Sequence, residues 1–406
     1  MKIKYIIKSH ICCGCGTCAG ICPINAIEMR INERGFYMPK IDERKCNNCG
    51  LCSKVCPQID KEANFNKLNK FVFGKVPDDK LIGKCINCCV GYSTDENIRF
   101  EASSGGMITQ ILISALEGWI IDGAVVTRMK KDNPLIPEPF IARTKEEIIS
   151  AMGSKYCPVH VNIMLKEIIK SKDDEKFAVV GLPCHILGIR KAELLIPKIQ
   201  KKIVLHLGLL CSGTKSFFGT EFILERKGIK KENVKNIKYR GNGWPGYMEV
   251  NHLNGIMYLP HLAHLYYGGG GFGTLFTNKC CIACDDFTAE LSDISVGDAW
   301  NIEKEDTQGS SIVILRSKIG EELIKRLSFE NKIKLKKIEG DIVMRSQSSL
   351  YSKKKLGISN RQNIGNKVNS KIIWLSTSPN SYIRKYFSLS FYILKILINK
   401  ITYWKK

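Results

Sequence analysis

Apolar and polar positions alternate along the chain in a way that separates predicted helices from predicted strands. From Phe100 onwards, segments with apolar residues at helical spacing take turns with short continuous apolar runs that are bounded by turn residues. The pattern predicts helices over 108–116, 159–169 and 185–193 and strands over 120–126, 177–181 and 203–210. Such an alternation indicates an α/β sheet.

The pattern changes after about residue 233, where the predicted strands become shorter and Gly-rich loops separate them. We expect these strands over 236–239, 247–253, 256–259, 293–296 and 311–316. Two polar stretches, 61–70 and 347–381, have the composition of linkers. The predicted domains are therefore 1–62, 70–232 and 233–340, followed by an extension over 341–406.

Two cysteine runs in the N-terminal part repeat one spacing. They are Cys12-x2-Cys15-x2-Cys18-x3-Cys22-Pro23 and Cys46-x2-Cys49-x2-Cys52-x3-Cys56-Pro57. This is the spacing of bacterial ferredoxins, in which three cysteines of a run bind one [4Fe-4S] cluster and the fourth binds the other cluster. We therefore assign Cys12, Cys15, Cys18 and Cys56 to one cluster, and Cys46, Cys49, Cys52 and Cys22 to the second. The expected fold class is α+β and α/β, with a two-cluster ferredoxin-like module ahead of an α/β body and a basic extension.

Structural zinc is the alternative for these runs, because paired Cys-x2-Cys motifs also build tetrahedral sites. Zinc requires neither a third cysteine at the same interval nor the Cys-Pro that ends each run here. Iron-sulfur clusters are therefore the favoured interpretation. Cys13 lies outside the ligand spacing and is expected to be a spectator thiol.

Length and charge narrow the possible functions. A chain of 406 residues is too long for a ferredoxin alone and predicts two or three domains. The net charge of +23 would suggest a nucleic acid partner, but thirteen Lys and Arg and no Asp or Glu follow Asp341. More than half of the excess charge therefore lies in the extension, and nucleic acid is not expected.

No run reaches about 18 apolar residues, so no spanning helix is predicted. Eighteen cysteines without a signal segment favour a reducing cytoplasm.

Further cysteines follow two of the predicted strands and a Gly-rich loop. Each alone could be a small buried apolar residue, since free cysteine is among the most buried residue types. Together Cys184, Cys211, Cys281 and Cys284 supply the four thiolates that a third cluster needs. Pro183 and Cys184 begin a predicted helix directly after a strand, where the helix dipole favours a thiolate.

Five ordered motifs between about residues 70 and 340 resemble the beta subunit family of coenzyme F420 hydrogenases and dehydrogenases. They are Ser103-Ser104-Gly105-Gly106, Gly153-Ser154-Lys155-Tyr156, Gly181-Leu182-Pro183-Cys184, the segment from Tyr239 to Gly246, and Cys281-x2-Cys284-Asp285 with the segment from Ala289 to Ala299. The resemblance implies a flavoprotein whose FAD exchanges a hydride and passes single electrons to iron-sulfur clusters. In the best-known members the hydride partner is the deazaflavin F420.

The residue types in these motifs suit such cofactors, although each has a purely structural alternative. Ser104, Gly105 and Gly106 at a helix start offer N–H groups to a pyrophosphate, or are an ordinary helix cap. Lys155 beside Tyr156 could bind a phosphate or the pyrimidine edge of a reduced flavin, or be a lone exposed lysine. Arg240 and Trp244 offer a cation and a flat surface to an acidic, aromatic cosubstrate, or form a turn with a packed tryptophan. We expect catalytic roles for Lys155, Arg240 and Trp244. The expected cofactor-binding residues are Ser103, Ser104, Gly105, Gly106, Ser154, Lys155, Tyr156 and Pro183.

Several features lie outside the resemblance. Cys157 and the group Cys85, Cys88 and Cys89 have no assigned role, and we expect the Gly-rich loop over 268–273 to cover the site. The acid-free segment over 382–406 mixes apolar and basic residues, so it could lie on an anionic membrane surface or dock on the protein.

The sequence thus predicts a cytoplasmic iron-sulfur flavoprotein that passes electrons between a hydride carrier and one-electron partners. The protein could also contact the inner membrane surface peripherally through its basic extension. Expected partners are F420 and a redox protein or hydrogenase and dehydrogenase subunits. One alternative is a ferredoxin-linked reductase of an organic compound. Another is a non-catalytic electron relay, which would lack FAD. The direction of electron flow is not encoded, because cluster potentials depend on their surroundings.

Overall fold

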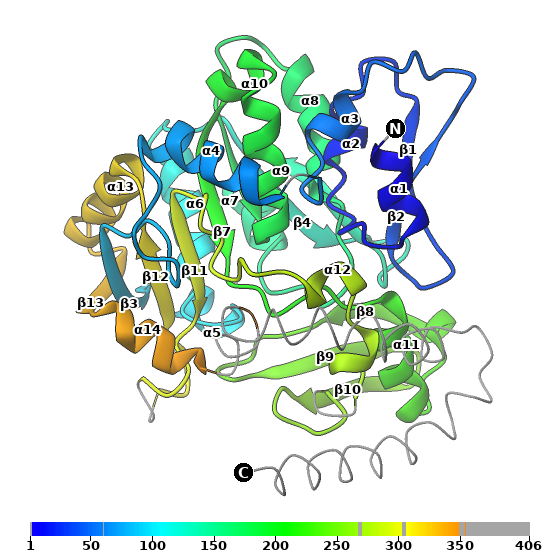
Figure 1. Cartoon of the computed structure of the whole chain (residues 1–406). Coiled ribbons are helices and arrows are strands. Elements are labelled where there is room, and N and C mark those ends of the chain that lie inside the picture. Colours follow the sequence, from blue (N-terminus) through cyan, green and yellow to red (C-terminus); the bar gives the residue numbers. More distant parts are fainter. Residues whose placement is uncertain (1, 60, 267–269, 303–305, 349–353, 355–406) are drawn as a thin grey trace, which may run out of the picture.

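The fold combines a small cysteine-rich module with a larger mixed α/β body (Figure 1). The computed structural model describes residues 2–59, 61–266, 270–302, 306–348 and 354. The predicted membrane-contacting segment over 382–406 and part of the Gly-rich loop lie outside these residues. No helix among the described residues combines the length and apolar character needed to cross a membrane.

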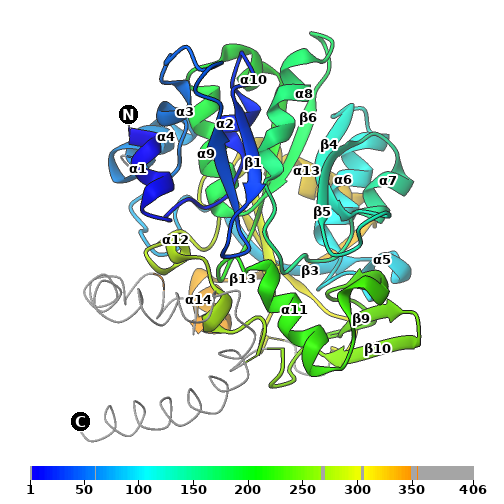
Figure 2. The same cartoon turned by 90° about the vertical axis from the view of Figure 1, so that its right-hand side faces the viewer.

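The N-terminal module is built around an antiparallel hairpin and short helices. Its elements are α1 (Lys2–Lys8), α2 (Thr17–Gly20), β1 (Ile27–Ile31), β2 (Tyr37–Ile41) and α3 (Leu51–Lys54). Both one-turn helices follow a glycine in the left-handed region, Gly16 at φ 84° and Gly50 at φ 77°, a conformation that other residues adopt at a cost. The repeated spacing in the sequence therefore becomes a repeated turn. Helix α2 of the module lies against α9 (Pro183–Glu193) of the body (Figure 1 and Figure 2).

An eight-stranded mixed sheet forms the centre of the body, in the order β13-β3-β12-β11-β7-β6-β4-β5. Its strands are β3 (Asn87–Ser93), β4 (Gly123–Met129), β5 (Pro137–Ala142), β6 (Phe177–Gly181), β7 (Ile203–Leu209), β11 (Ile294–Asp298), β12 (Ser311–Leu315) and β13 (Ile333–Ile338). The inner strands β4, β6, β7 and β11 pair in parallel and the outer strands pair antiparallel. The α/β prediction is thus confirmed, with antiparallel edges added.

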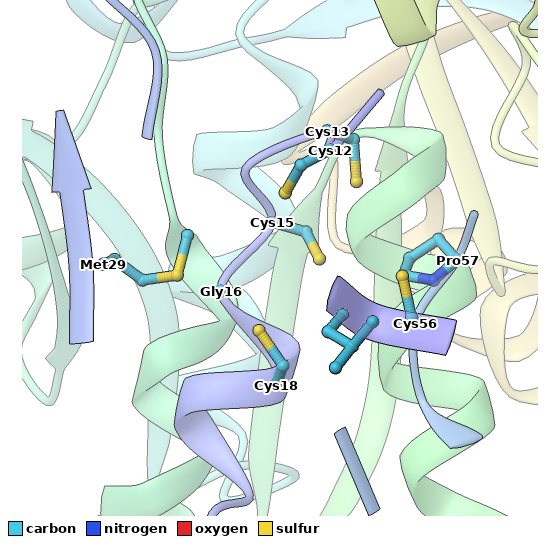
Figure 3. Close-up of a pocket in the computed structure, with 9 residues that line it drawn as sticks. Cys12, Cys13, Cys15, Gly16, Cys18, Met29, Cys56 and Pro57 are labelled. Atoms are coloured by element: carbon cyan, nitrogen blue, oxygen red, sulfur yellow. The ribbon is translucent and has the colours of Figure 1, made fainter. Parts of the chain in front are cut away.

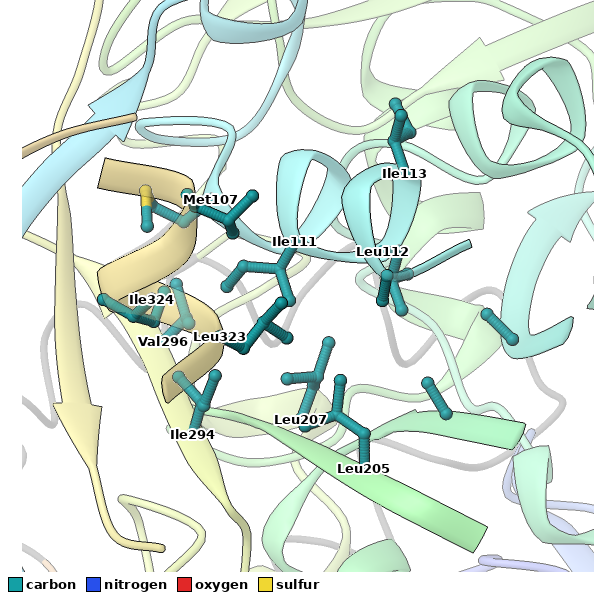
Figure 4. Close-up of a cluster of buried hydrophobic side chains, with 14 of the residues drawn as sticks. Met107, Ile111, Leu112, Ile113, Leu205, Leu207, Ile294, Val296, Leu323 and Ile324 are labelled. Atoms are coloured by element: carbon teal, nitrogen blue, oxygen red, sulfur yellow. The ribbon is translucent and has the colours of Figure 1, made fainter. Parts of the chain in front are cut away.

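Helices cover both faces of this sheet. On one face, α6 (Met107–Glu117) and α13 (Lys318–Phe329) pack against β7 and β11, where Ile111, Leu207 and Ile294 are fully buried (Figure 4). On the other face lie α8 (Leu165–Lys170), α9 and α10 (Pro197–Lys202). The remaining body helices before β8 are α5 (Glu96–Glu101), α7 (Lys145–Ser150), η1 (Val161–Met164), α11 (Phe217–Arg226) and η2 (Lys231–Asn233).

A second, three-stranded antiparallel sheet follows in the order β10-β9-β8. Its strands are β8 (Val234–Lys238), β9 (Tyr247–His252) and β10 (Gly255–Pro260), close to the predicted bounds. The short helices η3 (Thr274–Phe276) and α12 (Lys279–Ile282) then lead back to β11, and α14 (Gly340–Ser346) comes after β13.

One expected linker differs from the structure, and most of the other, 347–381, lies outside the described residues. The stretch over 61–70 belongs to helix α4 (Lys61–Phe73), whose Leu68 is fully buried in the same core as α9. Phe65 and Phe71 pack there too, so apolar residues three apart make one helical face in a segment that is otherwise polar. The first residues of the predicted extension also pack on the body. Val343 of α14 is buried, and Lys354 is 3% exposed.

Candidate iron-sulfur and cofactor sites

The first predicted cluster site is a small cavity lined by Cys12, Cys15, Cys18 and Cys56. Figure 3 shows Cys15 and Cys18 on one side of it and Cys56 with Pro57 on the other side. The turn that carries the first three cysteines passes through Gly14 and Gly16, both at positive φ. The four cysteines assigned to the first cluster are therefore close in space.

Free thiols are poorly suited to this cavity. Burial, with the neighbouring Cys15 second, raises the pKa of the Cys12 thiol to about 12. Burial followed by the charges of Cys15 and Cys12 also raises the pKa of Cys18 far above its usual range. Bound iron would supply the positive charge that four buried thiolates need. The donor set thus fits a [4Fe-4S] cluster.

The second predicted site lies nearer the surface. Cys46, Cys49 and Cys52 surround the turn at Gly50, and Cys49 is exposed. Burial, and then the charges of Cys49 and Cys46, raise the pKa of Cys52. The fourth predicted ligand, Cys22, is half-buried, and its Sγ accepts the N–H of Ala26 at 3.3 Å.

The third set comes together from three parts of the body. Cys184 begins α9 after β6, Cys211 follows β7, and Cys281 and Cys284 lie on and after α12. The charges of Cys211 and Cys281 act on Cys184, and those of Cys281 and Cys284 act on Cys211, so the four thiols are neighbours. The adjacent parallel strands β6 and β7 end at the same edge of the sheet, which explains how distant residues meet.

A buried lysine from the extension joins this third set. Lys354 Nζ lies 3.4 Å from the backbone oxygen of Asp286, which accepts a hydrogen bond from it. Burial opposes its charge, but Cys284, Cys211 and Cys281 raise the pKa of its ammonium above the ordinary value. Lys354 was not predicted from the sequence, because its neighbours have the composition of a linker.

Two cysteines outside the predicted ligands connect the first and third sets. Cys13, Cys15 and Cys280 form one buried cluster that Cys184 and Cys281 also contact. The Cys13 side chain lies next to both Cys15 and Cys184, and both affect the pKa of its thiol. Cys13, expected to be a spectator, therefore lies between a thiol of the module and a thiol of the body.

The spacing of these cysteines bears on the zinc alternative. Among the described residues, no three His, Cys, Asp or Glu side chains are placed to hold a single metal ion. Four thiolates on one zinc ion would be close together, since each Zn–S bond is about 2.3 Å long. No group of described side chains matches that arrangement.

Arg240 and Trp244 meet at one carboxylate. The buried Arg240 donates from Nη1 to Asp298 Oδ2 at 2.8 Å and from Nε to the Pro245 oxygen at 3.0 Å. Trp244 Nε1 donates to Asp298 Oδ1 at 3.3 Å. Asp298 lies at the end of β11, so the sheet positions the predicted binding loop. Asp298 belongs to the predicted motif from Ala289 to Ala299, but no role was predicted for it.

A cleft of about 460 Å³ opens beside this loop. Its lining includes Phe100, Trp244, Tyr247 and His261. Trp300 extends the aromatic surface, with ring centroids 4.7 Å from Trp244 and 5.8 Å from His261. The cleft lies in the size range of sites for planar cofactors.

One donor of Arg240 remains for a ligand. Its Nη2 atom is buried and makes no hydrogen bond of normal geometry with the described residues, although the Tyr156 hydroxyl also interacts with this guanidinium. An unsatisfied buried donor costs about 1–3 kcal/mol. An anionic or carbonyl-bearing ligand would satisfy this donor, so the residues here fit an acidic, planar group.

The motifs 103–106 and 153–156 adjoin this loop, but their polar groups make hydrogen bonds with other residues of the protein. Ser103 Oγ accepts the N–H of Ser154 at 2.7 Å, and the hydroxyls of Ser104 and Ser311 are 2.7 Å apart. A Cβ at Gly105 would lie 2.5 Å from the oxygen of Gly91, so close packing on β3 explains this glycine. The observed contacts agree with the structural alternative for these residues.

Lys155 faces the end of a helix. Its Nζ donates to the backbone oxygens of Ala151, Met152 and Gly153, just after α7. Burial lowers the pKa of its ammonium to about 7. Tyr156 packs in an aromatic group with Tyr239 and Phe272, at centroid distances of 6.2 and 5.3 Å. The structure thus brings Arg240 and Trp244 together, and holds Lys155 in contact with backbone carbonyls.

Comparison with known families gives three consecutive matches. Residues 88–166 match the family described as coenzyme F420 hydrogenase/dehydrogenase, beta subunit N-term, and residues 174–341 match the corresponding C terminus. Residues 11–58 match a 4Fe-4S dicluster domain. The matches follow the predicted order of the module and the body.

Individual relatives agree with these matches. The coenzyme F420 hydrogenase subunit beta of Methanothermobacter thermautotrophicus is 32% identical over 240 residues, which cover 58% of this chain and 78% of that protein. The coenzyme F420-dependent sulfite reductase of Methanocaldococcus jannaschii is 28% identical over 357 residues, covering 83% of this chain and 49% of that enzyme. A chain of the F420-reducing NiFe hydrogenase complex from Methanosarcina barkeri is similar in structure, with a TM-score of 0.55 and 27% identity, over 72% of this chain and 97% of that chain.

Proposed function

This chain belongs to the coenzyme F420 hydrogenase/dehydrogenase beta subunit family, and from that premise we propose that it is an iron-sulfur flavoprotein oxidoreductase. It transfers electrons between coenzyme F420 and one-electron partner proteins. Its cofactors are FAD and three [4Fe-4S] clusters, two in the module and one in the body.

The observation that carries the proposal is the contact of Cys13 with Cys15 and Cys184. It joins the first thiol set of the module to the third set of the body through buried sulfur atoms. A module tethered only for folding would not require its ligands to meet those of the body. The exposure of Cys49 supports a position for the second set at the outer end of this series.

The cleft beside Arg240 is the proposed site for the planar ring system. FAD supplies a group that accepts or gives a hydride on one side and single electrons on the other. Trp244 and His261 provide flat surfaces, and Arg240 Nη2 provides a donor for an anionic edge. Asp298 keeps Arg240 charged and fixes its orientation.

The proposed partners are other subunits or a redox protein that docks near Cys49. Similarity to a chain of a hydrogenase complex supports a subunit role. Contact of the basic extension with an anionic membrane, and a cytoplasmic location, remain proposals from the sequence.

The test is anaerobic purification followed by cofactor analysis and an F420 assay. We expect about twelve iron atoms and about twelve sulfides per chain, from three clusters of four each, and one FAD. Reduced F420 should bleach the bound flavin and reduce an artificial one-electron acceptor. Absence of flavin would support the relay alternative instead.

A second candidate function follows from the similarity to half of an F420-dependent sulfite reductase. In that case the module would deliver electrons to a reductase acting on a small compound. Flavin that reacts with F420 but passes electrons on only when a partner reductase and its small substrate are added would favour this candidate. Flavin that is present but does not react with F420 would instead favour the organic-substrate reductase predicted as an alternative from the sequence.

A further inference from the structure

Two cysteines outside all three proposed cluster sites lie against each other. Cys85 and Cys88 form a Cys-x2-Cys pair directly before and at the start of β3, and their Sγ atoms are 3.3 Å apart. Their positions differ in accessibility, because Cys85 is exposed and Cys88 is 4% exposed. A disulfide bond of about 2.05 Å would therefore need only a small approach of the two sulfur atoms.

The surroundings of this pair are unlike those of a cluster ligand. Cys88 pairs in the sheet with Ile314 of β12 and Ile338 of β13, and its side chain belongs to an apolar core. The adjacent Cys89 belongs to the core on the other face, as alternation along a strand requires. The thiols of Cys85 and Cys88 are thus close to each other, and the thiol of Cys89 lies on the opposite face of the sheet.

A buried guanidinium fixes the segment that carries Cys85. Arg316 is 1% exposed and donates from Nη1 to the oxygens of Ile82 and Lys84, at 2.7 and 2.6 Å. Its charge also favours a thiolate at Cys85. The same side chain donates from Nη2 to the oxygen of Thr288, at 3.2 Å. The loop before β3 is therefore held in place whatever the oxidation state of the pair.

We propose that Cys85 and Cys88 form a redox-active dithiol that exchanges with the disulfides of small molecules or proteins. The Cys85 thiolate attacks one sulfur of the incoming disulfide and releases the other sulfur as a thiolate. The Cys88 thiol then loses its proton and attacks Cys85, which forms the Cys85–Cys88 disulfide and releases the second thiolate. The pair loses two electrons and two protons, and the incoming disulfide becomes two thiols.

The electrostatics assign the two roles. The hydrogen bond from Cys88 and the charge of Arg316 together lower the pKa of Cys85 to about 7, against the opposing effects of burial and of Asp79. The same contact with Cys85, together with burial, raises the pKa of Cys88. The exposed sulfur is thus the nucleophile and the buried sulfur resolves the mixed disulfide, an arrangement that thiol exchange requires.

The test uses the full-length, cluster-loaded protein under anaerobic conditions. It is equilibrated with mixtures of oxidised and reduced dithiothreitol, alkylated, digested and analysed by mass spectrometry. We expect one transition in which the peptide containing residues 85–89 loses two hydrogens and two alkylation sites, with Cys89 still alkylated after unfolding. Alkylation of both Cys85 and Cys88 at every ratio, or a disulfide that includes Cys89, would overturn the proposal.

Three variants separate the roles, with iron content as the check that the fold is retained. Cys85→Ser should abolish the transition, whereas the matched variant Cys89→Ala should keep it. Cys88→Ser treated with oxidised glutathione should retain a stable glutathione adduct on Cys85, because the resolving thiol is missing. Absence of that adduct in a variant with full iron content would contradict the role of Cys85 as the nucleophile.

The reactivity of Cys85 provides an independent measurement. At pH 7 a thiol with a pKa near 7 has roughly 50 times more thiolate than a thiol with a pKa of about 9, while its intrinsic nucleophilicity is about eightfold lower. The alkylation rate of Cys85 should therefore exceed that of an ordinary exposed thiol about sixfold. A rate equal to or below that of glutathione would overturn the assignment.

Discussion

The Asp298 carboxylate accepts hydrogen bonds from both Arg240 and Trp244. Arg240 Nη1 lies 2.8 Å from Oδ2, and Trp244 Nε1 lies 3.3 Å from Oδ1. The Arg240 side chain is 1% exposed and that of Asp298 is 22% exposed, so the ion pair is largely withdrawn from water. Removal of one partner from such a pair leaves an uncompensated charge. The loop with the predicted binding residues therefore depends on this one carboxylate.

Arg240→Ala should lower the free energy of unfolding by roughly 2–4 kcal/mol, because Asp298 would lose its counter-charge in a partly buried place. The measurement is anaerobic urea unfolding followed by tryptophan fluorescence. The matched control is Arg128→Ala, since Arg128 and Glu138 form an ion pair whose side chains are 34% and 38% exposed. Its loss should cost less than about 1 kcal/mol.

The milder variant Arg240→Lys tests binding. It keeps a positive charge but loses the second donor, so the KM for F420 should increase more than kcat falls. An equal fall of kcat with unchanged KM would mean that Arg240 acts in the reaction and not mainly in binding.

Cys281→Ser and Cys284→Ser should each remove one cluster. The iron content should fall from about twelve to about eight atoms per chain, because the module retains its own ligands. Cys280→Ser is the matched control, since Cys280 is the buried neighbour of Cys281 and lies outside the proposed ligands. Iron analysis and cluster counting by electron paramagnetic resonance measure the result. Full iron content in all three variants would return Cys281 and Cys284 to a packing role.

The sequence predicted the elements whose pattern is local. The cysteine spacing, the apolar run that becomes β6 and the helical period that becomes α6 each report on neighbouring positions, and all were found near the expected bounds. Helix α4 was missed because Leu68 is one of few apolar residues among polar ones, and only its burial against α9 reveals its role. Lys155 could not be placed either, since the carbonyls that it contacts are set by where α7 ends.

Lys354 was beyond prediction for the same reason, and it gives a prediction of its own. Lys354→Met should lower the reduction potential of the body cluster by tens of millivolts, on the order expected when a positive charge beside a site is removed. A potentiometric titration followed by electron paramagnetic resonance measures the shift.

The matched control for Lys354 is Lys191→Met. Lys191 is also buried, but it donates to the oxygens of Cys56 and Ile59 in the module. Its replacement should shift the potential of the first module cluster and leave that of the body cluster unchanged. A body cluster whose potential is the same with Lys354 and with Met at that position would exclude an electrostatic role for Lys354.

A buried charge network predicts how stability depends on pH. His206 has a carboxylate at each ring nitrogen, with Glu193 Oε1 2.6 Å from Nε2 and Asp293 Oδ2 3.0 Å from Nδ1. Burial and Arg190 oppose its charged form, but Glu193 and Asp293 outweigh them and raise the pKa of His206. The pKa values of Glu193 and Asp293 are lowered, because their charged partners, His206 and Arg190, overcome the opposing effect of burial.

The signs of these shifts define the pH range. A raised histidine pKa stabilises the fold fully below the unfolded value of about 6.5, and the effect is lost as the pH rises through the folded value. The lowered carboxylate pKa values stabilise the fold above about pH 4, and that effect is lost as the pH falls. The network should therefore stabilise the protein most between about pH 5 and 6.5.

His206→Asn should lower the melting temperature most within this range, and its difference from the natural protein should shrink as the pH rises towards about 9. Anaerobic thermal unfolding at several pH values measures it. Glu193→Gln should weaken the fall in melting temperature above about pH 6.5, because it removes one of the two carboxylates that hold the proton on His206. A difference in melting temperature between the His206 variant and the natural protein that stays constant from about pH 5 to 9 would mean that His206 is neutral in the folded state. The network would then stabilise the fold through hydrogen bonds alone.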